Sequence, residues 1–147
     1  MNTRILILAH APLAHALREC ALHVLADSAL HVLALDVQPD AAPHATLAAA
    51  QLLLCPEVHH PTLVLTDVLG ATPCNVAQQL VQGSGSNARL LTGVNLPMLL
   101  RAICYCAEPL DAVAERALVG GTQGVMHLTS GLALASSPSL PLPLPLP

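Results

Sequence analysis

The strongest constraint on the fold is a short apolar run that stops at a histidine. Residues 5–9 are all apolar, His10 follows them, and Pro12 prevents the segment from continuing as a strand. An apolar run of this length is typical of a buried parallel strand. The carboxyl end of the first strand of an α/β fold lies in the crevice where these folds place ligands. His10 is therefore the first candidate for chemistry.

Strand and helix patterns alternate along the rest of the chain. We expect short strands at 5–9, 31–35, 61–66 and 88–91. Helical spacing or helix-start residues predict helices at 13–25, at 45–54 with a stop at Pro56, from 72, from about 95, and over 110–128. Gly120, Gly121 and Gly124 weaken the last helix and favour a bend or a break in it. Residues 83–86 are predicted to form a turn.

This alternation predicts an α/β fold with an open, mostly parallel, doubly wound sheet. Right-handed crossovers place helices on both faces, and the expected strand order is 2-1-3-4. A chain of 147 residues fits one domain, which we place at residues 1–130. The alternating leucine and proline residues near the C-terminus favour polyproline II, so residues 131–147 are predicted to be a disordered tail.

The composition is apolar, with 54% hydrophobic and 10% charged residues. One interpretation is that a second copy of the chain covers part of the surface, as in a homodimer; the other is a compositional bias towards alanine and leucine. The chain has no lysine, phenylalanine or tryptophan, and its five arginines are scattered. It therefore lacks the basic face and stacking aromatics that nucleic-acid binding requires.

The five cysteines are odd in number and lie mostly in apolar stretches, which favours reduced, packed thiols in a cytoplasmic protein. No run approaches the roughly 20 apolar residues that cross a bilayer, so we expect a protein peripheral to a membrane transporter at most. His59 and His60 near Cys55 are interpreted as a polar loop, because a zinc-ligand spacing is missing. No metal or cofactor site is predicted.

A second polar residue ends a predicted strand: Asp67 follows the run 61–66. Strands one and three are neighbours in the predicted order, so His10 and Asp67 should meet at one edge of the sheet. Gly70, Ala71 and Thr72 then lead into a helix, with Thr72 as the expected N-cap and Pro73 at the first helical position. Free N–H groups at such a terminus bind anions, and the Thr72 hydroxyl can donate to a phosphate oxygen.

These residue types suit histidine phosphorylation. A carboxylate at Asp67 would hold the proton on one ring nitrogen of His10 and leave the other nitrogen free to attack phosphorus. It would also stabilise the positive charge that develops on the ring. A helix terminus would supply the charge stabilisation that phosphoryl transfer needs.

With these motifs the chain resembles the mannose-type (mannose/fructose/sorbose) enzyme IIA components of the bacterial phosphoenolpyruvate:sugar phosphotransferase system. The resemblance is carried by the Ile-Leu-Ala-His segment ending at His10, by Leu-Thr-Asp-Val-Leu-Gly-Ala-Thr-Pro over 65–73, and by Gly-Val-Asn-Leu-Pro-Met-Leu over 93–99. It covers roughly residues 1–128. Ala11 and Ala71 stand where family members often have glycine.

The resemblance implies that His10 accepts a phosphoryl group from the phosphocarrier protein HPr and passes it to an enzyme IIB in sugar uptake. It also implies that Asp67 orients the histidine, that Thr72 faces the phosphate, and that the chain is a homodimer. A regulatory sensor whose phosphorylation state at His10 controls another protein would use the same residues. A third hypothesis is a flavodoxin-like nucleotide or flavin binder, although the first loop lacks a run of serine and threonine.

Overall fold

The four predicted strands form one parallel sheet in the computed structural model, which describes residues 1–54 and 59–129. The strands are β1 (Arg4–His10), β2 (Val32–Val37), β3 (Thr62–Thr66) and β4 (Ala88–Thr92). Their order is β2-β1-β3-β4, and each neighbouring pair is parallel. The predicted α/β sheet with strand order 2-1-3-4 is confirmed.

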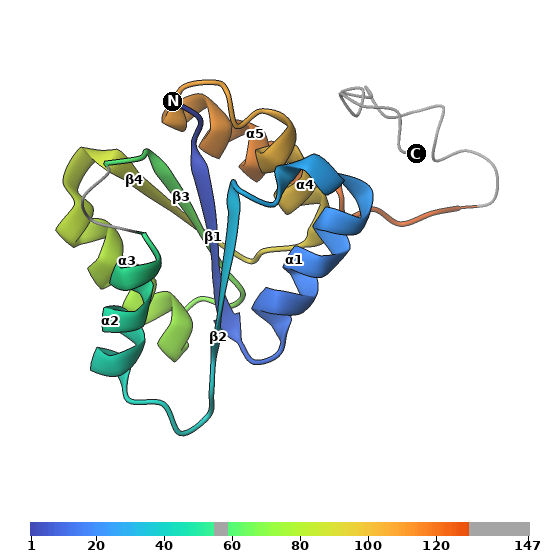
Figure 1. The fold of residues 1–147 in the computed structure, drawn as a ribbon. Helices are drawn as coiled ribbons and strands as arrows, with labels where there is room; N and C mark the ends of the chain where they lie inside the picture. The colour runs from blue at the N-terminus through green and yellow to red at the C-terminus, as the bar shows by residue number, and fades with distance from the viewer. Residues whose placement is uncertain (55–58, 130–147) are drawn as a thin grey trace.

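Helices cover both faces of this sheet. They are α1 (Leu13–Val24), α2 (Pro43–Leu53), α3 (Thr72–Ser84), α4 (Leu96–Cys104) and α5 (Leu110–Gln123). Figure 1 shows α2 and α3 on one side of the strands and α1, α4 and α5 on the other. This arrangement follows from connecting parallel strands by right-handed crossovers on the two sides of the starting strand.

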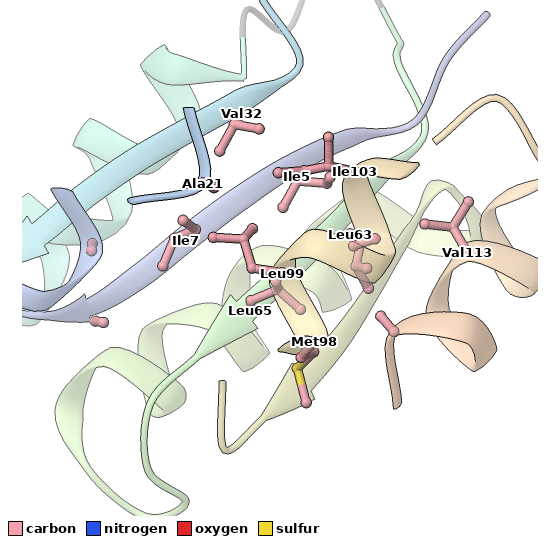
Figure 2. Packing of buried hydrophobic residues seen from close by; sticks show 14 residues of the cluster. Ile5, Ile7, Ala21, Val32, Leu63, Leu65, Met98, Leu99, Ile103 and Val113 are labelled. Carbon is pink, nitrogen blue, oxygen red and sulfur yellow. The ribbon is translucent and has the colours of Figure 1, made fainter. Parts of the chain in front are cut away.

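The core consists of two hydrophobic clusters that β1 separates. Ile5, Ile7 and Ala9 belong to the cluster beneath α1, α4 and α5, part of which Figure 2 shows at close range. Leu6 and Leu8 point the other way, into the cluster beneath α2 and α3. All five side chains are fully buried. Burial on both faces explains why this strand is continuously apolar instead of alternating with polar residues.

The second strand is longer than predicted. The sequence pattern places it at 31–35, whereas β2 spans Val32–Val37 and includes Asp36. A charged residue inside a strand ends an apolar pattern, so sequence reasoning stops before it. In the structure both oxygens of Asp36 accept hydrogen bonds from His15, which offsets the cost of partly burying the carboxylate.

The last helix differs from its prediction in two ways. It continues unbroken through Gly120 and Gly121, and it ends at Gln123 instead of Leu128, with Gly124 as its C-cap. Gly120 and Gly121 are buried, and they allow α5 to approach α4 closely. A Cβ atom on Gly120 would lie 2.8 Å from the Arg101 Cβ atom, and one on Gly121 would lie 2.9 Å from the Met98 Cβ atom. These glycines therefore serve helix packing.

Other boundaries shift by a few residues, and one cysteine differs from expectation. The predicted turn at 83–86 begins inside α3 and continues as a short 3-10 helix, Gly85–Asn87.

The sequence predicts that all the cysteines are packed thiols. Cys74 is buried as expected, and Cys104 and Cys106 are partly buried. Cys20 is exposed on α1, so the packing prediction was wrong for that thiol. Three predicted features lie outside the described residues: the helix stop at Pro56, the packing of Cys55 and the tail at 131–147.

The contact between α4 and α5 yields a test with a matched control. Gly120→Ala should destabilise the protein by about 1–3 kcal/mol, because the added methyl group overpacks against Arg101. Gly83→Ala, also inside a helix but with no neighbour within 4 Å, should be stabilising by about 0.5–1 kcal/mol. Urea unfolding of the two variants measures both effects. Equal stability of the two variants would contradict the close approach of these helices.

Candidate active site

The register of the sheet brings the two predicted site residues to the same edge. β1 ends at His10, β3 ends at Thr66, and Leu8 is in register with Thr66. Asp67 therefore follows directly after β3 beside the last residues of β1. Because both strands are parallel, their carboxyl ends meet in the crevice where ligands bind in this class of fold.

His10 and Asp67 are hydrogen-bonded although they lie 57 positions apart in the chain. The His10 ring Nδ1 lies 2.7 Å from Asp67 Oδ2, and the backbone N–H of His10 donates to the same oxygen at 3.0 Å. The N–H of Val68 donates to Asp67 Oδ1 at 2.9 Å. The Asp67 side chain is only 12% exposed, whereas the His10 ring is 51% exposed. Three hydrogen bonds thus hold the carboxylate, while about half of the imidazole surface faces solvent.

This geometry determines the roles of the two ring nitrogens. An ionised carboxylate can only accept hydrogen bonds, so Nδ1 of His10 carries the proton and donates it to Asp67. Nε2 of the neutral ring then holds a free lone pair. The second hydrogen bond, from the backbone of the same histidine, fixes the carboxylate relative to the ring. The pair presents an oriented nitrogen nucleophile at the surface.

Hydrogen bonding keeps Asp67 ionised. Desolvation by partial burial acts to raise the pKa of the carboxyl group. The hydrogen bonds from the His10 backbone, the His10 ring and the Val68 backbone outweigh that effect, so the pKa of Asp67 lies below its ordinary value. At neutral pH the carboxylate is therefore available to stabilise positive charge on the imidazole.

The predicted anion-binding segment follows Asp67, with one correction. Gly70 has φ +86°, a left-handed conformation that glycine adopts without strain, and Gly70 and Thr72 are exposed. Thr72 is not the N-cap of α3: Ala71 occupies that position, and Thr72 is the first helical residue. No side chain caps this helix end, so its first N–H groups have no side-chain acceptor. Ala71 is extended at φ −88°, a conformation that alanine adopts freely.

A second histidine–carboxylate pair, which sequence reasoning missed, lies at the same edge. His15 Nδ1 is 2.8 Å from Asp36 Oδ2, and the N–H of His15 donates to Asp36 Oδ1 at 3.1 Å. The two residues come from α1 and β2 and are 21 positions apart. Their separation in the sequence matches no ligand or catalytic spacing, so only the placement of α1 against β2 reveals them.

In the ranges 1–54 and 59–129, no group of three or more His, Cys, Asp or Glu residues could hold a metal ion. Two cavities, of about 420 and 320 Å³, are lined by residues other than His10 and Asp67. The larger lies at the amino ends of β3 and β4, next to Thr62 and Ala88. Within the part of the chain that the structure describes, no helix is long and apolar enough to cross a membrane.

Comparison with known proteins agrees with this fold. The family described as PTS system fructose IIA component matches residues 4–118, and the chain belongs to this family of phosphotransferase-system components. No curated protein sequence matches the chain.

Solved structures of phosphotransferase-system proteins share the fold. A mannose/sorbose-specific IIA subunit from Enterococcus faecalis is 25% identical, with a TM-score of 0.79 over 88% of this chain and 96% of that one. The EIIA component from Streptococcus agalactiae is 24% identical, with a TM-score of 0.75 over 85% and 96% of the two chains. A IIA protein associated with a fucose utilization operon of Streptococcus pneumoniae is 20% identical, with a TM-score of 0.70 over 86% and 93%. The predicted mannose-type IIA family is thereby confirmed.

The hydrogen bonds of Asp67 predict how the free energy of unfolding depends on pH. Because the folded-state pKa lies below that of the unfolded chain, the ionised carboxylate stabilises the fold fully above the unfolded pKa of about 3.9. This contribution is lost as the pH falls through that value towards the folded-state pKa. Wild type should therefore exceed Asp67→Asn in free energy of unfolding at pH 6, and the difference should narrow at pH 3. Urea denaturation at both pH values measures it; a difference independent of pH would contradict the role of the charge.

Proposed function

We propose that the protein accepts a phosphoryl group from phospho-HPr on Nε2 of His10 and relays it to an enzyme IIB in sugar uptake. The observation that carries this proposal is the 2.7 Å contact between His10 Nδ1 and Asp67 Oδ2, which leaves Nε2 at the surface. Membership of the IIA family makes phosphotransfer the expected chemistry. The donor, the acceptor and the phosphorylated atom are parts of the proposal.

The transfer breaks the phosphorus–nitrogen bond of the donor's phosphohistidine and forms a bond between phosphorus and His10 Nε2. The ring gains positive charge as this bond forms, while its proton stays on Nδ1. Asp67 accepts that proton's hydrogen bond and offsets the charge. The donor's imidazole leaves with the electron pair of the broken bond. In the transfer to IIB, the IIB nucleophile bonds to phosphorus, the bond between phosphorus and His10 Nε2 breaks, and the His10 ring leaves with the electron pair.

Gly70, Ala71 and Thr72 are assigned to the phosphoryl oxygens. They lie just before and at the start of α3, where the positive end of the helix dipole and N–H groups without a side-chain cap favour an anion. Gly70 makes the turn that leads into this end. The exposed hydroxyl of Thr72 has no hydrogen-bond partner among the described residues, so it is free to donate to a phosphoryl oxygen.

The surroundings of His10 favour a protein donor over a small bound nucleotide. Leu13, Val68 and Leu69, which follow closely on His10 and Asp67 in the chain, are exposed apolar residues of the kind found at protein interfaces. Neither of the two cavities described above includes His10. The flavin-binding hypothesis would need a pocket and stacking aromatics, and the chain contains no tryptophan or phenylalanine.

The phosphoryl transfer can be tested with purified components. Phosphoenolpyruvate, enzyme I and HPr should phosphorylate the wild type rapidly at His10, with an acid-labile and base-stable phosphate located by peptide mass spectrometry. His10→Ala should lose this rapid transfer. Asp67→Asn should keep the fold and slow the transfer by ~10²-fold or more, because the ring loses its orienting acid.

Two outcomes would contradict the assignment: rapid transfer persisting in His10→Ala, or an unchanged rate in Asp67→Asn. Mixing the phosphorylated protein with a mannose-type IIB then separates the two roles of His10. Loss of the phosphate to IIB supports sugar uptake, whereas a phosphate that IIB does not remove favours the regulatory sensor.

We also propose that the chain is a homodimer. Four apolar side chains are exposed on the last part of α5 and just beyond it: Leu118, Val125, Met126 and Leu128. A second copy of the chain would cover such side chains. Sedimentation equilibrium at micromolar concentration should give about twice the chain mass of 15.2 kDa. A single-chain mass at that concentration would contradict the homodimer.

A further inference from the structure

A second histidine at the carboxyl edge of the sheet has a local arrangement similar to that of His10, except that its two hydrogen bonds reach different oxygens of the acid. Asp36 accepts hydrogen bonds from both the backbone N–H and the ring Nδ1 of His15, as Asp67 does from His10. The exposures match as well: the His15 ring is 59% exposed and the Asp36 side chain 18%. In both pairs a shielded acid holds one nitrogen of a solvent-facing imidazole.

The sheet places this pair beside the first one. Asp36 is in register with Ala9, and Val37 is in register with His10, so Asp36 lies at the end of the strand next to β1. The order β2-β1-β3 puts His10 between Asp36 on one side and Asp67 on the other. His15 follows in the first turn of α1, which packs against β1 and β2. Both imidazoles therefore belong to the carboxyl edge of the sheet.

We propose that His15 is a second phosphoryl-accepting histidine, modified at Nε2, with Asp36 as its positioning residue. The chemical class of donor is a small phosphoryl compound with a good leaving group, such as a phosphoramidate, which needs no protein docking surface. This proposal goes beyond the relay through His10 and does not depend on HPr.

The chemistry follows from the tautomer. The carboxylate of Asp36 only accepts, so Nδ1 of His15 carries the proton and Nε2 carries the lone pair. With phosphoramidate, the bond between phosphorus and the donor nitrogen breaks and ammonia leaves with its electron pair. A bond between phosphorus and His15 Nε2 forms, the ring proton stays on Nδ1, and Asp36 offsets the positive charge on the ring.

His23 is a matched control within the same molecule. It lies on the same helix as His15 and is also exposed, but no carboxylate contacts it among the described residues. An exposed histidine without a hydrogen-bonded acid exchanges between tautomers and gains less stabilisation of positive charge on its ring. The comparison between His15 and His23 therefore isolates the effect of the acid from that of solvent exposure.

The experiment treats the full-length protein with phosphoramidate and follows each histidine by peptide mass spectrometry at alkaline pH. Phosphorus NMR identifies the modified nitrogen. His15 should react on the order of tenfold faster than His23. Asp36→Asn should reduce the rate at His15 to that of His23, while His10→Ala should leave the rate at His15 unchanged.

Equal rates at His15 and His23 in the wild type would overturn the proposal, and so would an Asp36→Asn variant in which His15 reacts as before. Either result would mean that Asp36 only ties α1 to β2. If Asp36→Asn fails to fold, the wild-type comparison still decides. A failure of transfer from HPr to His10 would leave this result untouched, so the two proposals fail separately.

Discussion

The central position of β1 is the constraint on which the rest of the structure depends. Its apolar residues are buried on both faces, and its neighbours β2 and β3 pair with it in parallel. β1 lies between two strands and two hydrophobic clusters, so a slip by one residue would turn Leu6 and Leu8 away from the cluster beneath α2 and α3. The register therefore determines where the strand ends, and with it the position of His10 between two acidic residues.

The two acids are stable in partly buried positions because each one is paired. Asp67 accepts three hydrogen bonds and Asp36 accepts two, so neither carboxylate is left without donors. Each acid in turn restricts its histidine to one tautomer. The same contacts thus satisfy a structural need and orient each imidazole, and this orientation is the basis of the proposed phosphoryl transfers.

On the sheet face opposite α2 and α3, helices α4 and α5 pack closely against each other. Asn95 caps α4 by accepting the N–H of Met98, and its side-chain amide donates to the carbonyl of Gly121 on α5. Gly120 and Gly121 leave room for this approach. Sequence reasoning predicted that these glycines weaken the helix and favour a bend or a break, because glycine lowers helix propensity. The structure shows that tertiary contacts outweigh that preference, since a larger residue would separate the helices.

The sequence by itself determined the number and order of the strands, the doubly wound topology, and the proximity of His10 to Asp67. These features follow from hydrophobic periodicity and from the parallel strands' shared edge, which are local and topological rules. Tertiary structure alone decided the extension of β2 to include Asp36 and the continuity of α5 through its glycines. It also produced the pair of His15 and Asp36. The extension of β2, the packing of α5 and the pair of His15 and Asp36 depend on contacts between segments distant in the chain, and residue pattern carries no information about them. The N-cap at Ala71 is instead a matter of local backbone angles.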